Sequence, residues 1–294
     1  MKGKMAKSPS HKFGQIIGDL LEATLYDLLS EVARELGLYL DYKHPRAARN
    51  GARKVRWKDH LENLHDLDFV MERNGSEDVY GVPKAFIEAA WRRYTRHSKN
   101  KAQEMQGALG PIADTYSAQH PFLGAVIAGE FTASSIEQLR SHGFTVIHIP
   151  YESIVRAFAV RGIDAYFDED TPDDELQARV DAFEALPADA KRQIQAELAR
   201  IHLYDLHGFL GSLRGSVNRV VSRVVVLPLS GVAFECGDID EAVAFIDGFD
   251  PDREKLTFVR YEIRLEFSSG EEVAARYFTK EDAIRFLRSN APAP

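Results

Sequence analysis

The sequence predicts an α/β fold, in which a mixed sheet flanked by helices is followed by a helical segment and a small C-terminal α+β domain. Residues 122–150 read as strand, helix and strand, which is a β-α-β unit with a right-handed crossover. Residues 68–88 read as two apolar runs joined by a polar turn, which predicts a hairpin. From residue 224 the pattern changes to short strands. We therefore expect domain boundaries at 12–165, 166–222 and 223–294.

The elements before the parallel pair follow from spacing and turn residues. Apolar side chains recur at helical spacing over residues 13–37 and predict an amphipathic helix that ends at Gly37. A short strand is expected at 38–42. A basic loop over 43–58 is typical of a phosphate-contacting segment, although such charge runs are also typical of a solvated loop. After the hairpin, residues 92–106 predict a helix broken by Gly107 and by Gly110-Pro111.

The remaining elements follow in the same way. A helix begins near Ser134 and ends at Gly143, and the strand 144–150 and a helix over 154–160 follow. Residues 176–185, 188–204 and 206–221 predict three helices. The last segment predicts strands at 223–229 and 231–236, a helix at 239–246, and a hairpin of 256–267 and 271–278 that turns at 268–270. Thr279 is expected to cap a final helix.

Composition places limits on compartment and partners. The chain has 294 residues and one cysteine, Cys236, so it forms no internal disulfide, which fits a reducing compartment. It contains no apolar run of the roughly 20 residues that a membrane span needs. We therefore expect a cytoplasmic protein without a membrane partner. Net charge is −8, yet residues 1–105 carry 19 Lys and Arg against 15 Asp and Glu. A locally basic face can still attract phosphate, because screening makes the field local.

Acidic residues at the ends of the predicted hairpin strands point to metal chemistry. Asp68 opens the first strand, and Glu88 closes the second. Carboxylate oxygens are the ligands that Mg²⁺ prefers, and a bound Mg²⁺ activates water and stabilises charge on phosphate. Asp66 is a rival for Asp68, since the two share a face of an extended chain. Glu72 and Glu77, near the turn, are expected at the surface.

This arrangement resembles the PD-(D/E)XK nuclease superfamily, which includes many restriction endonucleases. The resemblance covers about residues 10–160 and maps the family's two acids onto Asp68 and Glu88. It departs from the family pattern at Leu67, where Pro is frequent, and at Ala90, where the motif Lys belongs. The resemblance implies a restriction-endonuclease-like mixed sheet, a Mg²⁺ cofactor and a third acid on the first helix, for which Glu22 is the candidate.

A basic segment after Glu88 offers replacements for the missing lysine. Some family members supply this Lys from the following helix, where Lys99 and Lys101 lie. Residues two apart on a helix point about 200° apart, so only one of them can face the strands. Lys101 shares a face with Glu104, and we therefore favour a site of Asp68, Glu88, Lys101 and Glu104. The DNA-contacting candidates are Arg92, Arg93, Arg96, Lys99, Arg53, Lys54 and Arg56.

The function we expect from these residues is that of a Mg²⁺-dependent DNA endonuclease in restriction or phage defence. The alternatives are a catalytically inactive nuclease-fold protein that binds DNA or takes part in assembly, which Ala90 favours, and a regulatory protein whose C-terminal domain binds a partner. The expected partner is DNA; a homodimer and a partner methyltransferase are further expectations. The sequence contains no P-loop, no dinucleotide fingerprint and no zinc-spaced Cys/His set.

Overall fold

The computed structural model describes residues 8–228, 233–250, 258–268 and 270–291. The chain forms two units, each described separately below. The first comprises Met1–Asp114 and Phe122–Arg214, and the second comprises Thr115–Pro121 and Gly215–Pro294. Most of the helical segment expected over 166–222 therefore belongs to the same unit as the mixed sheet.

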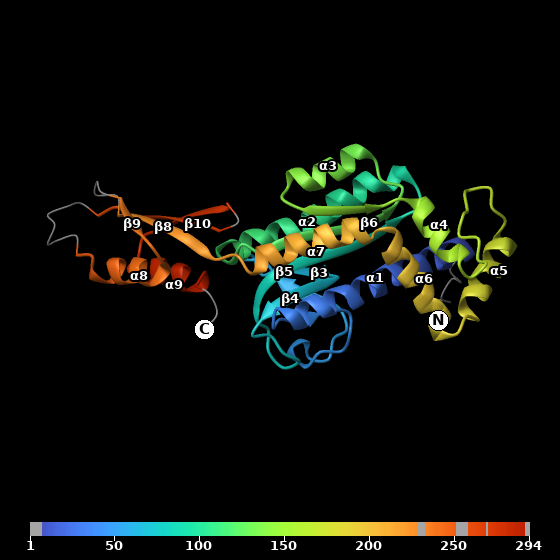
Figure 1. Ribbon diagram of the computed structural model, residues 1–294, viewed down its shortest axis with the longest axis horizontal. Helices are drawn as coiled ribbons and strands as arrows, with labels where there is room; N and C mark the ends of the chain where they lie inside the picture. The colour runs from blue at the N-terminus through green and yellow to red at the C-terminus, as the bar shows by residue number, and fades with distance from the viewer. Residues whose placement is uncertain (1–7, 229–232, 251–257, 269, 292–294) are drawn as a thin grey trace. The chain divides into compact units, whose positions relative to one another are not determined.

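The first unit is built on a five-stranded mixed sheet with the strand order β1-β4-β5-β6-β7 (Figure 1). Its strands are β1 (Tyr39–Asp41), β4 (Phe69–Arg73), β5 (Val82–Arg92), β6 (Phe122–Gly129) and β7 (Thr145–Ile149). The pairs β1–β4 and β4–β5 are antiparallel, whereas β5–β6 and β6–β7 are parallel. The mixed α/β class, the hairpin and the parallel pair predicted from sequence are confirmed.

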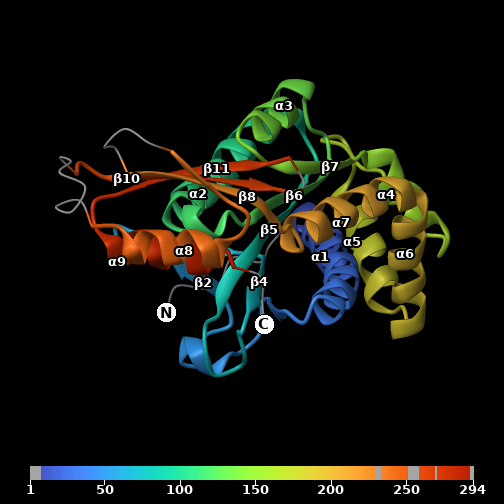
Figure 2. The same cartoon turned by 60° about the vertical axis from the view of Figure 1, so that its left-hand side comes forward.

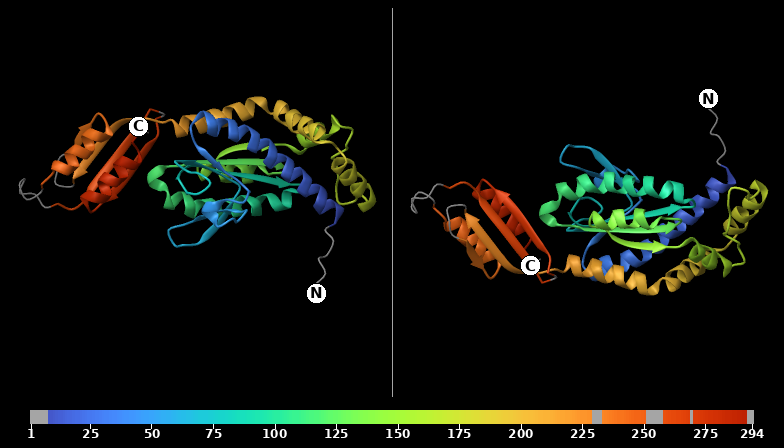
Figure 3. Two further views of the ribbon diagram at one scale, coloured as in Figure 1. Left: turned by 90° about the horizontal axis from the view of Figure 1, so that it is seen from below. Right: turned by 90° about the horizontal axis from the view of Figure 1, so that it is seen from above.

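Helices cover both faces of this sheet (Figure 3). On one face lie α1 (Pro9–Glu35) and α7 (Leu203–Val217), and on the other lies α2 (Ser98–Thr115). Phe209 of α7 packs edge-on against Phe122 of β6, with 5.4 Å between ring centroids. The crossover from β6 to β7 is α3 (Ala133–Ser141), and α4 (Tyr151–Ala159) follows β7. The helical segment contributes α5 (Asp173–Glu184), α6 (Ala188–Ile201) and α7.

The bounds predicted for the helix over 92–106 are wrong at both ends. Strand β5 continues to Arg92, because its pairing with β6 extends to Arg92 and Gly129, and a 3₁₀ turn, η2 (Thr95–His97), precedes α2. At the other end, α2 passes through Gly110 and Pro111 to Thr115. Buried Ala102, Met105, Leu109 and Ile112 form an apolar stripe along it. Burying a large apolar side chain contributes about 1.5–3 kcal/mol, so this stripe offsets the roughly 3 kcal/mol that an internal proline costs.

The predicted basic loop contains secondary structure and a buried ion cluster. A 3₁₀ turn, η1 (Ala47–Arg49), precedes β2 (Val55–Lys58), which pairs with β3 (Leu64–Leu67) in a separate two-stranded sheet. Arg46 is fully buried and binds the carboxylates of Asp41 at 2.8 Å and Glu72 at 2.6 Å. Arg49 binds Asp41 from the other side. The expectation that Glu72 lies at the surface is therefore wrong, and Arg46 and Arg49 stabilise the fold.

The second unit contains two successive strand–strand–helix segments. The first is β8 (Val221–Pro228), β9 (Phe234–Cys236) and α8 (Ile239–Gly248), and the second is β10 (Tyr261–Phe267), β11 (Glu272–Tyr277) and α9 (Lys280–Ser289). They form one antiparallel sheet, ordered β11-β10-β8-β9, with α8 and α9 on one face (Figure 2). A short 3₁₀ turn, η3 (Ser117–Gln119), also belongs to this unit. The predicted α+β class of this segment is confirmed.

The two helices of the second unit begin alike. Asp238 caps α8 and Thr279 caps α9, each accepting a hydrogen bond from the backbone N–H three residues on. The fourth residue after each cap is a fully buried alanine, Ala242 or Ala283. The single cysteine, Cys236, is buried. The predicted strand residues 229 and 231–232, the start of the strand at 256 and turn residue 269 lie outside the described residues.

Across the described ranges, no helix is long and apolar enough to cross a membrane.

Candidate active site

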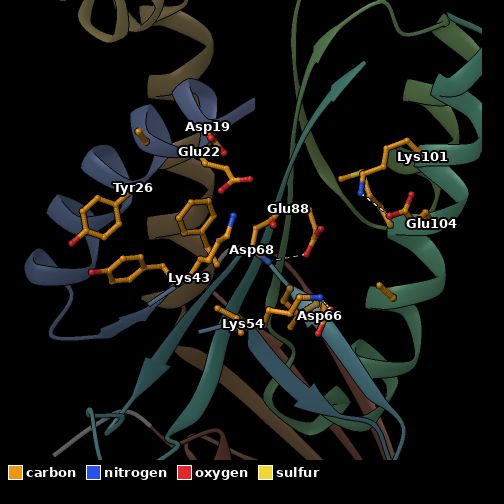
Figure 4. Close-up of a pocket in the computed structure, with 17 residues that line it drawn as sticks. Asp19, Glu22, Tyr26, Lys43, Lys54, Asp66, Asp68, Glu88, Lys101 and Glu104 are labelled. Carbon is orange, nitrogen blue, oxygen red and sulfur yellow. Dashed lines mark hydrogen bonds and ion pairs between the residues drawn. The ribbon is translucent and has the colours of Figure 1, made fainter. Parts of the chain in front are cut away.

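Asp68 and Glu88 are neighbours across the β4–β5 pair. Phe69 pairs with Ile87, so continuing this antiparallel register by one residue sets Asp68 opposite Glu88. The Asp68 N–H donates to Glu88 Oε1 at 3.2 Å, and the Ala89 N–H donates to Asp68 Oδ2 at 2.8 Å. Each carboxylate is thus fixed by a backbone N–H at or beside the other residue (Figure 4).

Burial and mutual repulsion make this pair hard to ionise. The pKa of Glu88 is raised well above its usual value by burial and then by the charge of Asp68. Burial also raises the pKa of Asp68, against a hydrogen bond from the Ala89 N–H and the positive charge of Lys101. Two carboxyl groups this close cannot both ionise readily without a nearby cation. The pair therefore retains a proton to higher pH than isolated carboxyl groups do, and a divalent cation bound there would compete with that proton.

The pair lies at a pocket of about 520 Å³ between α1 and α2 (Figure 4). Six carboxylates and three ammonium groups line this pocket. The acids are Asp19, Glu22, Asp66, Asp68, Glu88 and Glu104, and the bases are Lys43, Lys54 and Lys101. With every group ionised the lining carries a net charge of about −3, which favours divalent cations and opposes a bare phosphate.

Lys101 projects from α2 toward the acidic pair. Its side chain is 14% exposed and binds Glu104 Oε1 at 3.1 Å. It lines the same pocket as Asp68 and Glu88, and its charge lowers the pKa of both acids. Lys99 does not line the pocket. The structure thus brings Asp68, Glu88, Lys101 and Glu104 together, although Glu104 is exposed and also lies 3.7 Å from Arg92.

Glu22 and Lys43 approach Asp68 from the opposite side of the pocket (Figure 4). The pKa of Glu22 is raised by burial first and by the charge of Asp68 second, while Lys43 lowers it. Lys43 was not selected as a site residue from the sequence. Its position follows from the β1–β4 register, in which Asp41 pairs with Val70 and the continued register sets Lys43 opposite Asp68. Only the pairing of β1 with β4 could have identified it.

Asp66 and Asp68 both line the pocket but have different partners. Asp66 lies on β3, opposite Arg56 of β2, and forms ion pairs with Lys54 and Arg56. Burial opposes ionisation of Asp66, but the hydrogen bonds from Lys54 and Arg56 outweigh it and lower the pKa of the carboxyl. Asp66 therefore forms the rim of the pocket as a neutralised acid, whereas Asp68 meets Glu88.

The basic side chains proposed to contact DNA lie in different environments. Arg93 packs against the rings of Tyr151 at 4.2 Å and Tyr94 at 5.0 Å and donates to the Phe167 carbonyl at 2.5 Å, so its guanidinium is held by the protein. Arg96 pairs with Glu169 at 2.6 Å on the surface. Arg92 is partly exposed in a groove that adjoins the acidic pocket, and Lys99 and Arg53 are exposed.

Two of the acidic side chains, and not three, are placed to hold one metal ion. Within the described ranges, no three His, Cys, Asp or Glu side chains are close enough together to hold one ion. Glu22 therefore does not complete a three-ligand group with Asp68 and Glu88. Mg²⁺ commonly uses one or two carboxylates and takes its other ligands from water and substrate phosphate. The Asp68–Glu88 pair, hard to ionise and set in an acidic pocket, fits that requirement.

Comparison with known proteins assigns no family. No family model matches the sequence, and no curated protein matches it significantly. Among solved structures, the crystal structure of a protein of unknown function, AF1548, is similar over 64% of this chain and 99% of its own, with 13% identity and a TM-score of 0.29. A similarity at that level supports no conclusion about function.

Proposed function

We propose that the protein is a Mg²⁺-dependent endonuclease that hydrolyses phosphodiester bonds in DNA. The observation that carries the proposal is the meeting of Asp68, Glu88 and the Lys101 side chain at one acidic pocket. A role in restriction or phage defence belongs to the same proposal and rests on the resemblance alone.

Each residue has a distinct role in this proposal. Asp68 and Glu88 hold the metal, and a Mg²⁺ bound there would activate water and offset charge on the phosphate. Lys101 lies close enough to influence the pKa of both acids, so its ammonium can hold the attacking water or a phosphate oxygen. Glu104 orients Lys101 by accepting from its ammonium. Arg92, in the adjoining groove, is positioned to contact the DNA backbone.

The second candidate is a nuclease-fold protein that binds DNA without cutting it. Ala90 favours this reading, because it is two residues beyond Glu88 on the same face of β5, where a lysine would reach the site. Lys101 opposes it, since its side chain extends from α2 into the same pocket and its charge acts on Glu88. The two candidates therefore differ in whether Lys101 replaces the motif lysine.

Cleavage of supercoiled plasmid and of a single-stranded oligonucleotide, each with Mg²⁺, with Mn²⁺ and with EDTA, tests the proposal. Asp68→Asn and Glu88→Gln should each lower the cleavage rate by at least about 100-fold, since even outer-shell changes at metal sites cost about 10–100-fold. The matched control is Glu62→Gln, an exposed acid outside the pocket, which should cleave like the wild type. Wild-type protein that binds DNA but cleaves none with either metal would establish the second candidate instead.

A further inference from the structure

Three aromatic rings, those of His44, Tyr42 and Tyr26, form a column beside the acidic pocket, and Tyr42 and Tyr26 line that pocket. The Tyr26 ring is tilted by 46° to the Tyr42 ring. The ring of Tyr42 lies 4.3 Å from that of His44 and 4.4 Å from that of Tyr26, between centroids. No contact joins Tyr26 and His44 among the ring pairs of the described residues, so the Tyr42 ring lies between the other two. His44 is fixed in turn, because its Nδ1 is 2.8 Å from the Tyr42 carbonyl oxygen. The column is therefore anchored at His44 and ends at Tyr26.

Tyr26 belongs to the same face of α1 as two of the acids in the pocket. Asp19, Glu22 and Tyr26 all line it, at spacings of three and four residues that a helix places on one side. Glu22 and Tyr26 are separated by about 6 Å of helix rise. Among the described residues, Tyr42 is the only ring in contact with Tyr26. Because Tyr26 lines the pocket, an aromatic group bound there can contact its ring about one helical turn from Glu22.

The volume of the pocket is consistent with a single nucleotide. A volume of about 520 Å³ lies in the range of roughly 300–1,000 Å³ for pockets that enclose one small molecule. A duplex is far wider, since its major groove alone measures about 12 Å across. A single nucleotide can place its base against Tyr26 and its phosphate beside the Asp68–Glu88 pair. Stacking on an aromatic side chain accepts any base, because every base has a π face.

We propose that Tyr26 is a stacking platform for an unpaired nucleobase, so that the site takes single-stranded or tailed DNA in preference to closed duplex. This inference rests on the proposed function, and it names the substrate class of that site. Tyr42, which also lines the pocket, packs against the Tyr26 ring, and His44 packs against Tyr42. Lys43, which lines the same pocket, is positioned to meet the phosphate.

Equilibrium binding tests the inference separately from cleavage. We would use Ca²⁺, an oxygen-seeking cation of looser geometry, in place of Mg²⁺. The probes are a single-stranded oligonucleotide, a duplex with a short unpaired tail, and a duplex closed by a hairpin at both ends. Each carries 2-aminopurine, at the unpaired positions where there are any, because its fluorescence falls when the base stacks. The wild type should bind the first two at least about tenfold more tightly than the closed duplex and quench only those probes.

Three variants separate stacking from stability. Tyr26→Leu should bind the unpaired probes about 5- to 150-fold more weakly, which is the usual effect of losing one base–aromatic stack, and should lose the quenching. Tyr26→Phe keeps the ring and should behave like the wild type, and so should Tyr204→Leu, which removes a tyrosine that is 90% exposed and outside the pocket. Equal affinity for closed and tailed duplexes, or unchanged binding and quenching in a folded Tyr26→Leu, would overturn the inference. Failure to cleave any DNA with Mg²⁺ or Mn²⁺ would instead overturn the proposed endonuclease.

Discussion

Replacing Glu88 with Gln should stabilise the first unit at neutral pH when no divalent metal is present. Glu88 is 6% exposed and adjacent to Asp68, so ionising it places a second negative charge in a buried site. Glutamine has nearly the same shape, and its amide oxygen can still accept the hydrogen bond that the Asp68 N–H donates. The substitution therefore removes the electrostatic cost and keeps the packing.

Proton linkage gives the sign and the slope of the change in unfolding free energy with pH. The folded-state pKa of Glu88 lies well above its usual value of 4.5, so between those two pKa values the folded state holds a proton that the unfolded state has lost. This contribution to stability is complete below the unfolded pKa and is lost as pH rises through the folded pKa. In that window the wild type loses up to about 1.4 kcal/mol per pH unit from this group. Glu88→Gln should lose correspondingly less.

Tryptophan fluorescence isolates the first unit in this experiment. The chain contains 2 tryptophans, and both Trp57 and Trp91 belong to the first unit. Urea unfolding followed by their emission, at pH 5, 6, 7 and 8 with EDTA, gives the free energy of unfolding of that unit. Glu62 has an exposed carboxylate, so the unfolding free energy of Glu62→Gln should change with pH as that of the wild type does. The reasoning would be refuted if the unfolding free energy of Glu88→Gln showed the same pH dependence as that of the wild type.

Adding Mg²⁺ to the same unfolding series should make the wild type more stable than Glu88→Gln. A metal that binds only the folded state adds about 1.4 kcal/mol when its concentration is ten times its Kd. The wild type should gain this stability, and the gain should grow with pH because the metal competes with the proton shared by Asp68 and Glu88. Glu88→Gln should gain much less. An equal gain in both proteins would place the metal elsewhere.

The remaining predictions concern the basic residues. Lys101→Ala should abolish Mg²⁺-dependent cleavage while largely preserving DNA binding, and Lys99→Ala should retain much more activity; the reverse result, on the same plasmid and binding probe, would exchange their roles. Replacing Arg92 and Arg96 together with Ala should reduce the log–log salt slope of DNA binding by about 1.8, which an unchanged slope would contradict. Arg46→Ala should cost about 3–5 kcal/mol in urea unfolding, because it leaves two fully buried carboxylates without their shared cation.

The sequence was sufficient for the features that depend on local pattern. Apolar runs bounded by Asp68 and Glu88 predict two strands, the polar residues between them predict the reversal, and the pairing then brings the two acids together. Helical periodicity lets only one of Lys99 and Lys101 face the strands, and Lys101 is the one that lines the pocket. These inferences needed only the repeat of a strand or a helix.

Other features depend on contacts between residues far apart in the chain, which no local pattern reveals. Lys43 joins the site through the pairing of β1 with β4, and Arg46 is buried because Asp41 and Glu72 meet it from different strands. Arg93 resembles its basic neighbours in the sequence but is held by the Phe167 carbonyl, 74 residues away. A basic side chain therefore cannot be assigned to DNA or to the fold until its partners are known.

The turn between β5 and α2 explains how a lysine on a helix can replace one on a strand. Glu88 and Lys101 are separated by the end of β5, by η2 and by the first turn of α2, yet the charge of Lys101 acts on Glu88. Arg93 fixes the start of this turn through Phe167 and the surrounding rings, and the buried Ser98 fixes its end by donating to the Thr95 carbonyl at 2.8 Å. With both ends fixed, α2 starts in a defined rotation and presents Lys101 to the acids. In the proposed endonuclease, Lys101 of α2 would supply the ammonium that Ala90 lacks.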